Sequence, residues 1–318
     1  MGRVMAKYRS KLPQLGGELF LSDGGIETSL IFLDGIELPY FAAFDLLKTK
    51  EGRESLRKYY MPYLGLAKSR GLGFVLESPT WRASQDWGQK LGYSAEEIAK
   101  INRKAIDLMV ELRDRYQTTA TSPIVISGCI GPRGDGYDPG NIMSPDEAQH
   151  YHSLQVKVFR ETEADMVSAI TMTNVNEAIG LTRAAAAAGM PVSISFTLET
   201  DGRLPTGQAL KDAVLEVDAA TKGAPAYFMI NCAHPTHFQN VLNVKEPWIG
   251  RIRGLRANAS KRSHAELDNS TDLDAGNPAE LGAQYGDLRR LLPKLNVFGG
   301  CCGTDHRHLT EIAKATAA

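Results

Sequence analysis

The cysteines are the residues of this chain whose type and placement point most directly to chemistry. There are four, at positions 129, 232, 301 and 302, and the adjacent Cys301 and Cys302 have glycine on both sides. Thiolates are soft ligands that suit Zn²⁺, which prefers tetrahedral sulfur at about 2.3 Å. The flanking glycines would let the backbone bend so that both neighbouring thiols reach one ion.

Other interpretations of the cysteines stay open from their type alone. A lone cysteine is usually a small buried hydrophobe, and we assign Cys129 that role because no partner residue is indicated for it. The Cys301–Cys302 pair could also be inert, or could form a strained redox disulfide. A disulfide scaffold is not expected, because four thiols are too few and too unevenly placed.

Eight short apolar runs predict eight buried strands. They are rich in β-branched and aromatic residues and end near Gly, Asn, Ser or Asp, which is typical of parallel strands buried on both faces. The runs are 19–22, 74–76, 124–127, 166–170, 192–196, 227–230, 252–255 and 297–298. Helical patterns lie between them, at 53–70, 94–116, from Ser144 onward, 174–188, 209–221, 277–292 and 306–317. Ser94 with Glu97, and Ser144 with Glu147, predict capping boxes.

Eight alternating units favour a closed (β/α)₈ TIM barrel over a doubly wound sheet, which usually has fewer strands. We expect one barrel domain over residues 1–318, with 1–15 as an N-terminal extension and long loops at 131–144, 199–207 and 258–276. The active site of such a barrel lies at the C-terminal ends of its strands. Cys232 would follow the sixth strand and the Cys301–Cys302 pair the eighth. The three thiols would then form a metal site with one ligand position open.

Six segments resemble the homocysteine S-methyltransferase family. This family includes betaine- and S-methylmethionine-dependent enzymes and the homocysteine domain of cobalamin-dependent methionine synthase. The segments occur in the family's order at 21–25 (LSDGG), 131–135 (GPRGD), 195–197 (SFT) with 201–202 (DG), 231–233 (NCA), 256–258 (RAN) and 299–304 (GGCCGT). The Asn-Cys pair together with Gly-Gly-Cys-Cys-Gly-Thr is the most specific combination among them.

The resemblance implies a zinc ion held by Cys232, Cys301 and Cys302, with the sulfur of a thiol acceptor as the fourth ligand. It also implies that the backbone amides of Gly24 and Gly25 receive the carboxylate of an amino-acid acceptor. A glycine turn exposes adjacent N–H groups to an anion, so this role is chemically reasonable.

Three further polar residues belong to the same predicted site. Asp23 would line the carboxylate-binding end, while Asn231 and Asn258 would hydrogen-bond loops or substrate near the metal. We take Asp23 and Asn231 as candidate catalytic residues and Asn258 as substrate-binding. A turn-capping role for Asp23 and structural roles for both asparagines stay open. The histidines near the cysteines are interpreted as surface residues at helix starts: His234, His237, His306 and His308.

The sequence departs from the family where an acid is expected to bind the acceptor's ammonium group. The end of the fourth strand carries Ile170 at that position, and no acid lies between Asp165 and Glu177. A buried, unpaired ammonium would be costly. Either another acid substitutes, with Glu77 and Glu199 as candidates, or the acceptor lacks an α-amino group.

A second departure follows the second strand. The family's betaine enzymes place an aromatic residue there to bind a quaternary ammonium through cation–π attraction. Trp81 could offer a π face, but Arg82 stands at the aromatic position, and its fixed charge would suit a carboxylate better than a cation. We therefore expect a sulfonium donor rather than glycine betaine, with Glu77, Trp81 and Arg82 as substrate-binding candidates.

Composition limits the remaining classes. The 318 residues include 36 Lys and Arg against 37 Asp and Glu, and 43% are hydrophobic, so the chain is globular rather than disordered. Near-zero net charge argues against nucleic-acid binding, and no apolar run approaches the roughly 20 residues of a membrane helix. The first 14 residues lack the apolar core of a secretory signal, so we expect a cytoplasmic protein.

These observations predict a zinc-dependent thiol S-methyltransferase. It would move a methyl group from a sulfonium or betaine-type donor to homocysteine, giving methionine, or to a related thiol. Its partners would be a small-molecule thiol acceptor and a methyl donor, with no nucleic acid and no membrane. The alternatives are the same chemistry on a thiol without an amino group, a zinc- or thiol-binding protein without turnover, and a redox protein that uses a Cys301–Cys302 disulfide.

Overall fold

The computed structural model describes residues 6–117 and 122–317. Eight parallel strands close into a barrel in which strands consecutive in sequence are neighbours and β8 pairs with β1. The strands are β1 (Phe20–Leu21), β2 (Gly73–Glu77), β3 (Ile124–Ile130), β4 (Met166–Met172), β5 (Val192–Thr197), β6 (Tyr227–Asn231), β7 (Ile252–Ala257) and β8 (Val297–Gly300). The predicted (β/α)₈ barrel is confirmed, and each predicted strand is present.

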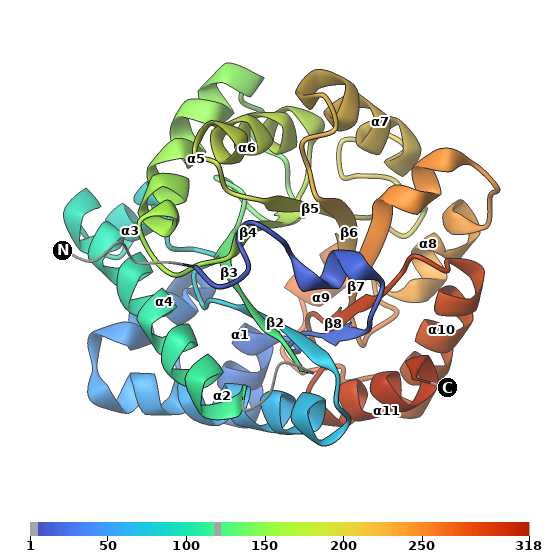
Figure 1. Cartoon of the computed structure of the whole chain (residues 1–318), viewed down its shortest axis with the longest axis horizontal. Helices are drawn as coiled ribbons and strands as arrows, with labels where there is room; N and C mark the ends of the chain where they lie inside the picture. Colours follow the sequence, from blue (N-terminus) through green and yellow to red (C-terminus); the bar gives the residue numbers. More distant parts are fainter. Residues whose placement is uncertain (1–5, 118–121, 318) are drawn as a thin grey trace.

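Helices form a ring around the strands (Figure 1). The longer ones are α2 (Lys50–Ser69), α4 (Ala95–Tyr116), α5 (Pro145–Arg160), α6 (Val175–Ala187), α7 (Leu210–Thr221), α8 (Pro235–Leu242), α10 (Pro278–Leu291) and α11 (His306–Thr316). The shorter ones are α1 (Ile26–Thr28), α3 (Gln85–Lys90) and α9 (His264–Asp268), with a π-helical turn at Ser29–Leu33 and 3₁₀ turns at Pro13–Gly16, Pro39–Phe41, Ala43–Lys48 and Pro247–Arg251. None of the helices in the described ranges is long and apolar enough to span a membrane.

Local capping explains where the main helices begin. Ser94 and Glu97 form the predicted capping box of α4, and α5 begins with the same arrangement. Asn174 and Asn277 accept backbone N–H bonds at the starts of α6 and α10. The helix α2 begins earlier than predicted because Thr49 accepts the Gly52 amide and caps it.

Several sequence-based expectations were wrong: α3 and α8 were not predicted, and β7 and β8 end two residues later than expected. The predicted loop 258–276 contains the short helix α9, whose start is capped by Ser263 and Glu266. The strands β3 and β4 also continue past their apolar runs, to Ile130 and Met172. Small and polar residues interrupt the apolar pattern there, but the backbone ladder continues, with Cys129 paired to Ser168.

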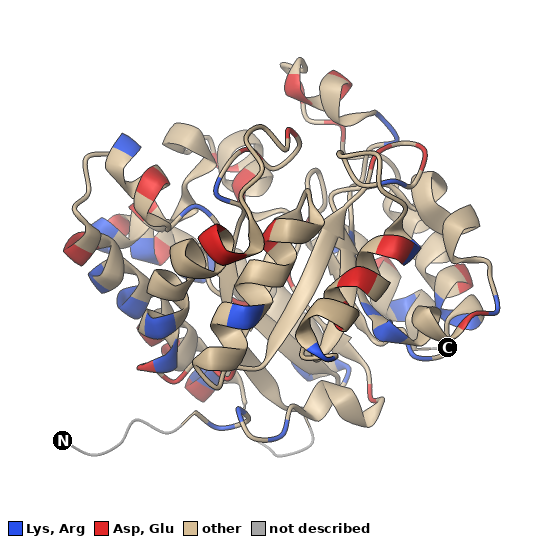
Figure 2. Ribbon diagram, turned by 90° about the horizontal axis from the view of Figure 1, so that it is seen from above, with Lys and Arg blue, Asp and Glu red and all other residues tan. Residues whose placement is uncertain are grey.

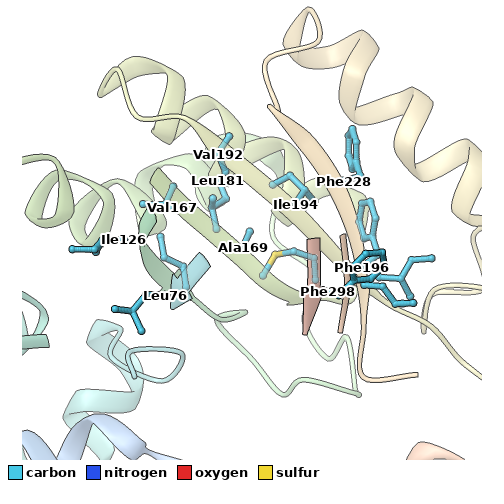
Figure 3. Close-up of a cluster of buried hydrophobic side chains, with 14 of the residues drawn as sticks. Leu76, Ile126, Val167, Ala169, Leu181, Val192, Ile194, Phe196, Phe228 and Phe298 are labelled. Carbon is cyan, nitrogen blue, oxygen red and sulfur yellow. The ribbon is translucent and has the colours of Figure 1, made fainter. Parts of the chain in front are cut away.

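The apolar core has an outer and an inner part. The outer part lies between the strands and the helices, where side chains such as Leu76, Val167, Ile194 and Phe298 gather (Figure 3). Charged residues lie mainly on the helices and outer loops (Figure 2). This distribution leaves the barrel strands surrounded by apolar contacts.

The inner part fills the N-terminal end of the barrel. It consists of Leu12, Phe20, Val75, Val125, Met166, Tyr227, Met229 and Val297. The predicted N-terminal extension takes part, because Gln14 Nε2 donates to Met166 Sδ at 3.2 Å and Arg9 donates to the carbonyls of Thr162 and Ala164. The described part of this extension therefore covers the end of the barrel opposite the cysteines.

The barrel interior becomes polar towards the C-terminal ends of the strands. Two residues beyond the apolar floor come Glu77, Ser127 and Ser168, which face the same side because strand side chains alternate. The Oγ atoms of Ser127 and Ser168 lie 2.7 Å apart, and Ser193 Oγ donates to Ser168 Oγ at 3.0 Å. This polar layer separates the apolar N-terminal part of the barrel interior from the C-terminal mouth of the barrel.

The packing of α6 on α5 gives a test of the fold. A Cβ added at Gly180 would lie 2.4 Å from Ala148 Cβ, whereas one added at Gly65 on α2 meets no atom within 4 Å outside its own helix backbone. We expect Gly180→Ala to lower the free energy of unfolding by about 1–3 kcal/mol, and Gly65→Ala to raise it by about 0.5–1 kcal/mol. Urea unfolding followed by circular dichroism measures both. Equal stability of the two variants would contradict the close contact of these helices.

Candidate active site

Three thiols meet at the C-terminal mouth of the barrel. The Sγ atoms of Cys232, Cys301 and Cys302 all lie within 4.8 Å of one another. Cys232 follows β6 and the pair follows β8, so closure of the barrel brings them together across β7, as predicted. All four cysteines are free. Three sulfurs at this spacing match three corners of a tetrahedral metal site.

The backbone of Cys232 is held in an unusual conformation. Its φ is 53°, in the left-handed region that non-glycine residues rarely adopt. Its amide donates to the Arg256 carbonyl at 3.1 Å, and its carbonyl accepts from His264 Nε2 at 2.6 Å. The other ring nitrogen of His264 lies 3.2 Å from Glu199 Oε1. Together these contacts hold the turn that carries the Cys232 thiol in its strained conformation.

The loop after β3 adds an aromatic hydroxyl to the cluster. Tyr137 Oη lies 3.6 Å from Cys302 Sγ, and its ring stacks on His264 with centroids 3.9 Å apart. Burial, reinforced by the neighbouring cysteines, raises the pKa of Tyr137 well above its ordinary value, so it stays a neutral hydroxyl. Sequence reasoning missed Tyr137 and His264, since both lie in segments predicted only as loops.

Asn231 ties three strands together beneath the cysteine cluster. Its Oδ1 accepts the Thr171 amide at 3.0 Å and Ser195 Oγ at 2.6 Å, and its Nδ2 donates to Thr171 Oγ1 at 2.8 Å. Thr171 has a φ of 66°, and its hydroxyl lies 3.9 Å from Cys232 Sγ. Both the oxygen and the nitrogen of the Asn231 amide thus bond to groups of the protein.

Asp23 forms a buried ion pair with Arg256. Arg256 Nη1 lies 2.7 Å from Asp23 Oδ1, and Tyr59 donates to Asp23 Oδ2 at 2.9 Å. Arg256 also donates to Ser22 Oγ and to the Gly24 carbonyl. Residues 256–258 belong to a motif of the sequence, but Arg256 was not predicted to be a site residue. Nothing in the local sequence indicates that its side chain reaches across to the end of β1.

The two glycines after Asp23 pack directly on the cysteine loop. A Cβ at Gly24 would lie 2.7 Å from the Thr304 carbonyl oxygen, and one at Gly25 would lie 2.5 Å from the Cys301 carbonyl oxygen. Only glycine allows this approach. The Gly25 amide donates to the Thr304 carbonyl at 3.0 Å, which leaves Gly24 as the better candidate for the predicted carboxylate contact.

A cavity of about 290 Å³ opens beside the cluster. Its walls include the three clustered cysteines, Cys129, Asp23, Gly24, Gly25, Glu27, Glu77, Trp81, Arg82, Tyr137, Ile170 and Arg256. Most of the predicted site residues are therefore brought together. Asn231 and Asn258 are not among the lining residues, and the buried Asn258 Oδ1 has no hydrogen-bond partner within the described residues.

The acids near the cavity differ from those expected. Ile170 lines the wall without a carboxylate, and Glu199 is bonded to His264 rather than lining the cavity. Glu77 is buried at the end of β2, and burial raises its pKa to about 6. Glu27 on α1 was not selected from the sequence, although it lies two residues beyond the Asp-Gly-Gly motif; burial raises its pKa to about 7.

Arg82 and Trp81 form one wall of the cavity. The Arg82 guanidinium lies between Trp81 and Trp87, 4.1 and 3.7 Å from the ring centroids. It donates to the Gly134 carbonyl at 2.7 Å and lies 3.6 Å from Asp135 Oδ2. Trp81 Nε1 donates to the Ile170 carbonyl at 3.2 Å. The positive charge of Arg82 therefore interacts with a backbone carbonyl, a nearby carboxylate and two aromatic rings of the protein itself.

The histidines near the cysteines do begin helices, but the surface placement was wrong for two of them. His234 caps α8 through the Thr236 amide, and His308 lies in the first turn of α11 with its Nε2 at 2.8 Å from the Ala275 carbonyl. Both are buried, because they bond backbone groups of neighbouring turns. None of the four lines the cavity.

Comparison with known proteins agrees with this geometry. The family model described as homocysteine S-methyltransferase matches residues 20–316. Homocysteine S-methyltransferase 1 of Arabidopsis thaliana is 24% identical, over 92% of this chain and 91% of its own. Selenocysteine Se-methyltransferase of Brassica oleracea var. italica is 22% identical, over 95% and 90%.

Solved structures agree on the fold. The oxidized form of the homocysteine methyltransferase MmuM from Escherichia coli superposes with a TM-score of 0.74 at 18% identity, covering 94% of this chain and 96% of that one. Its metallated form gives a TM-score of 0.68 at 19% identity, with the same coverage. The chain belongs to the homocysteine S-methyltransferase family. It is a methyltransferase of the thiol-directed class, built on a TIM barrel.

The Asp23–Arg256 pair gives a test of the site's stability. Arg256→Leu leaves a buried carboxylate without its cation, and we expect it to lower the free energy of unfolding by about 3–5 kcal/mol. The double variant Asp23→Asn/Arg256→Leu should lose clearly less than the sum of the single changes, as measured in a urea double-mutant cycle. Arg290→Ala breaks an exposed pair with Asp287 and should cost at most about 1 kcal/mol. Additive losses at Asp23 and Arg256 would show that the pair does not couple.

Proposed function

We propose that this protein is a zinc-dependent methyltransferase that moves a methyl group from a sulfonium donor to homocysteine, giving methionine. The observation that carries the proposal is the cluster of Cys232, Cys301 and Cys302 at the wall of a cavity large enough for small substrates. The family model and the relatives named as homocysteine S-methyltransferases support the acceptor.

The residues present fit zinc on chemical grounds. Three sulfurs from two loops converge with no carboxylate among them, and soft sulfur ligands favour Zn²⁺ over hard cations. Zinc bound there would supply a Lewis acid that holds the acceptor's sulfur as thiolate at neutral pH, where a free thiol is mostly protonated.

The methyl transfer then needs alignment more than acid–base chemistry. A new bond forms between the acceptor's thiolate sulfur and the methyl carbon, while the bond from that carbon to the donor's positive sulfur breaks. The bonding electron pair passes to the donor's sulfur, which leaves as a neutral thioether. The rigid turn at Cys232 and the walls formed by Trp81 and Tyr137 would hold the two reactants in line and exclude water.

The rim of the cavity favours a cationic donor. Asp135, Asp268, Asp272 and Asp274 all line it, and their charges raise the local concentration of positive ligands. Trp81 and Tyr137 add aromatic rings, which attract cations through their faces. A sulfonium compound satisfies both features.

The deciding experiment is methionine formation by zinc-loaded protein from homocysteine. S-methylmethionine, S-adenosylmethionine and betaine are supplied as separate donors, and products are identified by mass spectrometry. We expect methionine with a sulfonium donor. If neither homocysteine nor any thiol or selenol in a panel is methylated by any of these donors, the proposal fails.

The ligand assignment has its own test in zinc content. We expect Cys301→Ser to lower bound zinc well below one equivalent and to reduce methyl transfer, because a hydroxyl is a poor ligand for Zn²⁺ beside thiolates. Cys129→Ser is the matched control: Cys129 also lines the cavity but lies outside the cluster, so zinc should stay near one equivalent. Elemental analysis after gel filtration measures both. Unchanged zinc in Cys301→Ser would rule out this ligand set.

A further inference from the structure

The cavity has more carboxylates than cations to pair with them. Its two basic lining residues are Arg82 and Arg256. Arg256 is paired with Asp23, and Arg82 lies 3.6 Å from Asp135. Glu27 and Glu77 also line the cavity, and neither has a basic side chain within 4.0 Å in the part of the chain that the structure describes. A ligand that brings positive charge is therefore favoured in this space, because a carboxylate shielded from water is costly unless it is paired or protonated.

Glu27 lies between two residues that contact the cysteine loop. Gly25, two residues before it, packs so closely that an added Cβ would lie 2.5 Å from the Cys301 carbonyl oxygen. Thr28, one residue after it, accepts the Gly303 amide at 3.1 Å through its hydroxyl. The carboxylate between these contacts interacts electrostatically with Cys301, Asp23 and Arg256. Glu77 lies lower, at the level of the serine layer below the cavity.

We propose that Glu27 binds the ammonium group of the acceptor, in place of the acid that is absent at Ile170. The inference rests on the proposed function, since it assumes that the acceptor's sulfur lies at the cysteine cluster. In homocysteine only two methylene groups separate the sulfur from the carbon that bears the amine. With the sulfur at the cluster, the ammonium must therefore lie close to the cysteine loop, on which the segment that carries Glu27 packs. The acceptor is then an amino thiol recognised through its amine.

The donor's cation is the competing ligand for Glu27. The segment that carries Glu27 is packed on the Cys301 carbonyl, whereas the rim acids Asp135, Asp268 and Asp272 lie on the loop after β3, at the end of α9 and in the segment that follows α9. The rim acid Asp274 also packs on the cysteine loop, but through its backbone carbonyl beside Gly303. Glu27 is thus assigned to the acceptor and the rim to the donor. Measurements made without any donor separate the two roles.

The test is direct binding of three thiols to zinc-loaded protein by isothermal titration calorimetry, with no methyl donor present. The thiols are homocysteine, 3-aminopropane-1-thiol, which lacks the carboxylate, and 4-sulfanylbutanoate, which lacks the amine. We expect Glu27→Gln to weaken the two amino thiols about tenfold or more, the loss typical of one charge-assisted hydrogen bond. The affinity for 4-sulfanylbutanoate should stay the same or rise.

Controls decide between Glu27 and the alternatives. Glu37→Gln changes an exposed acid that does not line the cavity and should leave all three affinities unchanged. Zinc content and urea unfolding verify that Glu27→Gln is loaded and folded. The proposal is overturned if Glu27→Gln weakens all three thiols equally, or if Glu77→Gln alone produces the amine-selective loss. It is likewise overturned if the unmodified protein binds 4-sulfanylbutanoate as tightly as homocysteine. Because no methyl transfer is measured, these outcomes are distinct from a failure of the proposed reaction.

Discussion

The site depends on the C-terminal end of β7, which joins the two cysteine segments. The Arg256 carbonyl accepts the Cys232 amide at 3.1 Å, and the next carbonyl, of Ala257, accepts the Cys301 amide at 2.9 Å. One residue further on lies Asn258, and then the Ala259 amide donates to the Cys302 carbonyl at 3.0 Å. The three thiols therefore keep their spacing because one continuous strand end hydrogen-bonds to the segments on either side. These backbone hydrogen bonds preorganise the segments that carry the ligands, and side chains such as His264 add further contacts.

Arg256 links this backbone arrangement to the substrate cavity. Its carbonyl fixes Cys232, while its guanidinium crosses to β1 and neutralises Asp23. The same residue thus couples the metal-ligating turn to the Asp-Gly-Gly segment that packs on the cysteine loop. The left-handed backbone at Cys232 carries a conformational cost, and these surrounding hydrogen bonds are what maintain it.

Much of the fold could be predicted from sequence because its signals are local. Apolar runs predicted all the strands, and capping residues such as Ser94 and Asn277 predicted the starts of several long helices. The cysteine cluster was also predictable, since barrel topology alone decides that the ends of β6 and β8 share a rim. Tyr137 and His264 could not be found in this way, because their roles arise from contacts between loops far apart in sequence. The strand ends were misjudged at β3 and β4, where polar inward residues hide a continuing ladder.

The Ile170 position, where the sequence comparison leads us to expect an acid, raises the question of how the cavity balances the charge of a cationic ligand. To bind a charged ligand, the cavity as a whole must balance the ligand's charge. The carboxylate that does so can come from any strand or loop that reaches the cavity. In this chain Asp23 is neutralised by Arg256, so it contributes little net charge to the cavity. Glu27 and Glu77 also line the cavity without a basic side chain within 4.0 Å among the described residues, at positions that a comparison of single aligned residues would not examine. The absence of an acid at Ile170 is therefore compatible with a rearranged set of acids, in which the half-buried Glu27 and the buried Glu77 line the cavity beside the cysteine cluster.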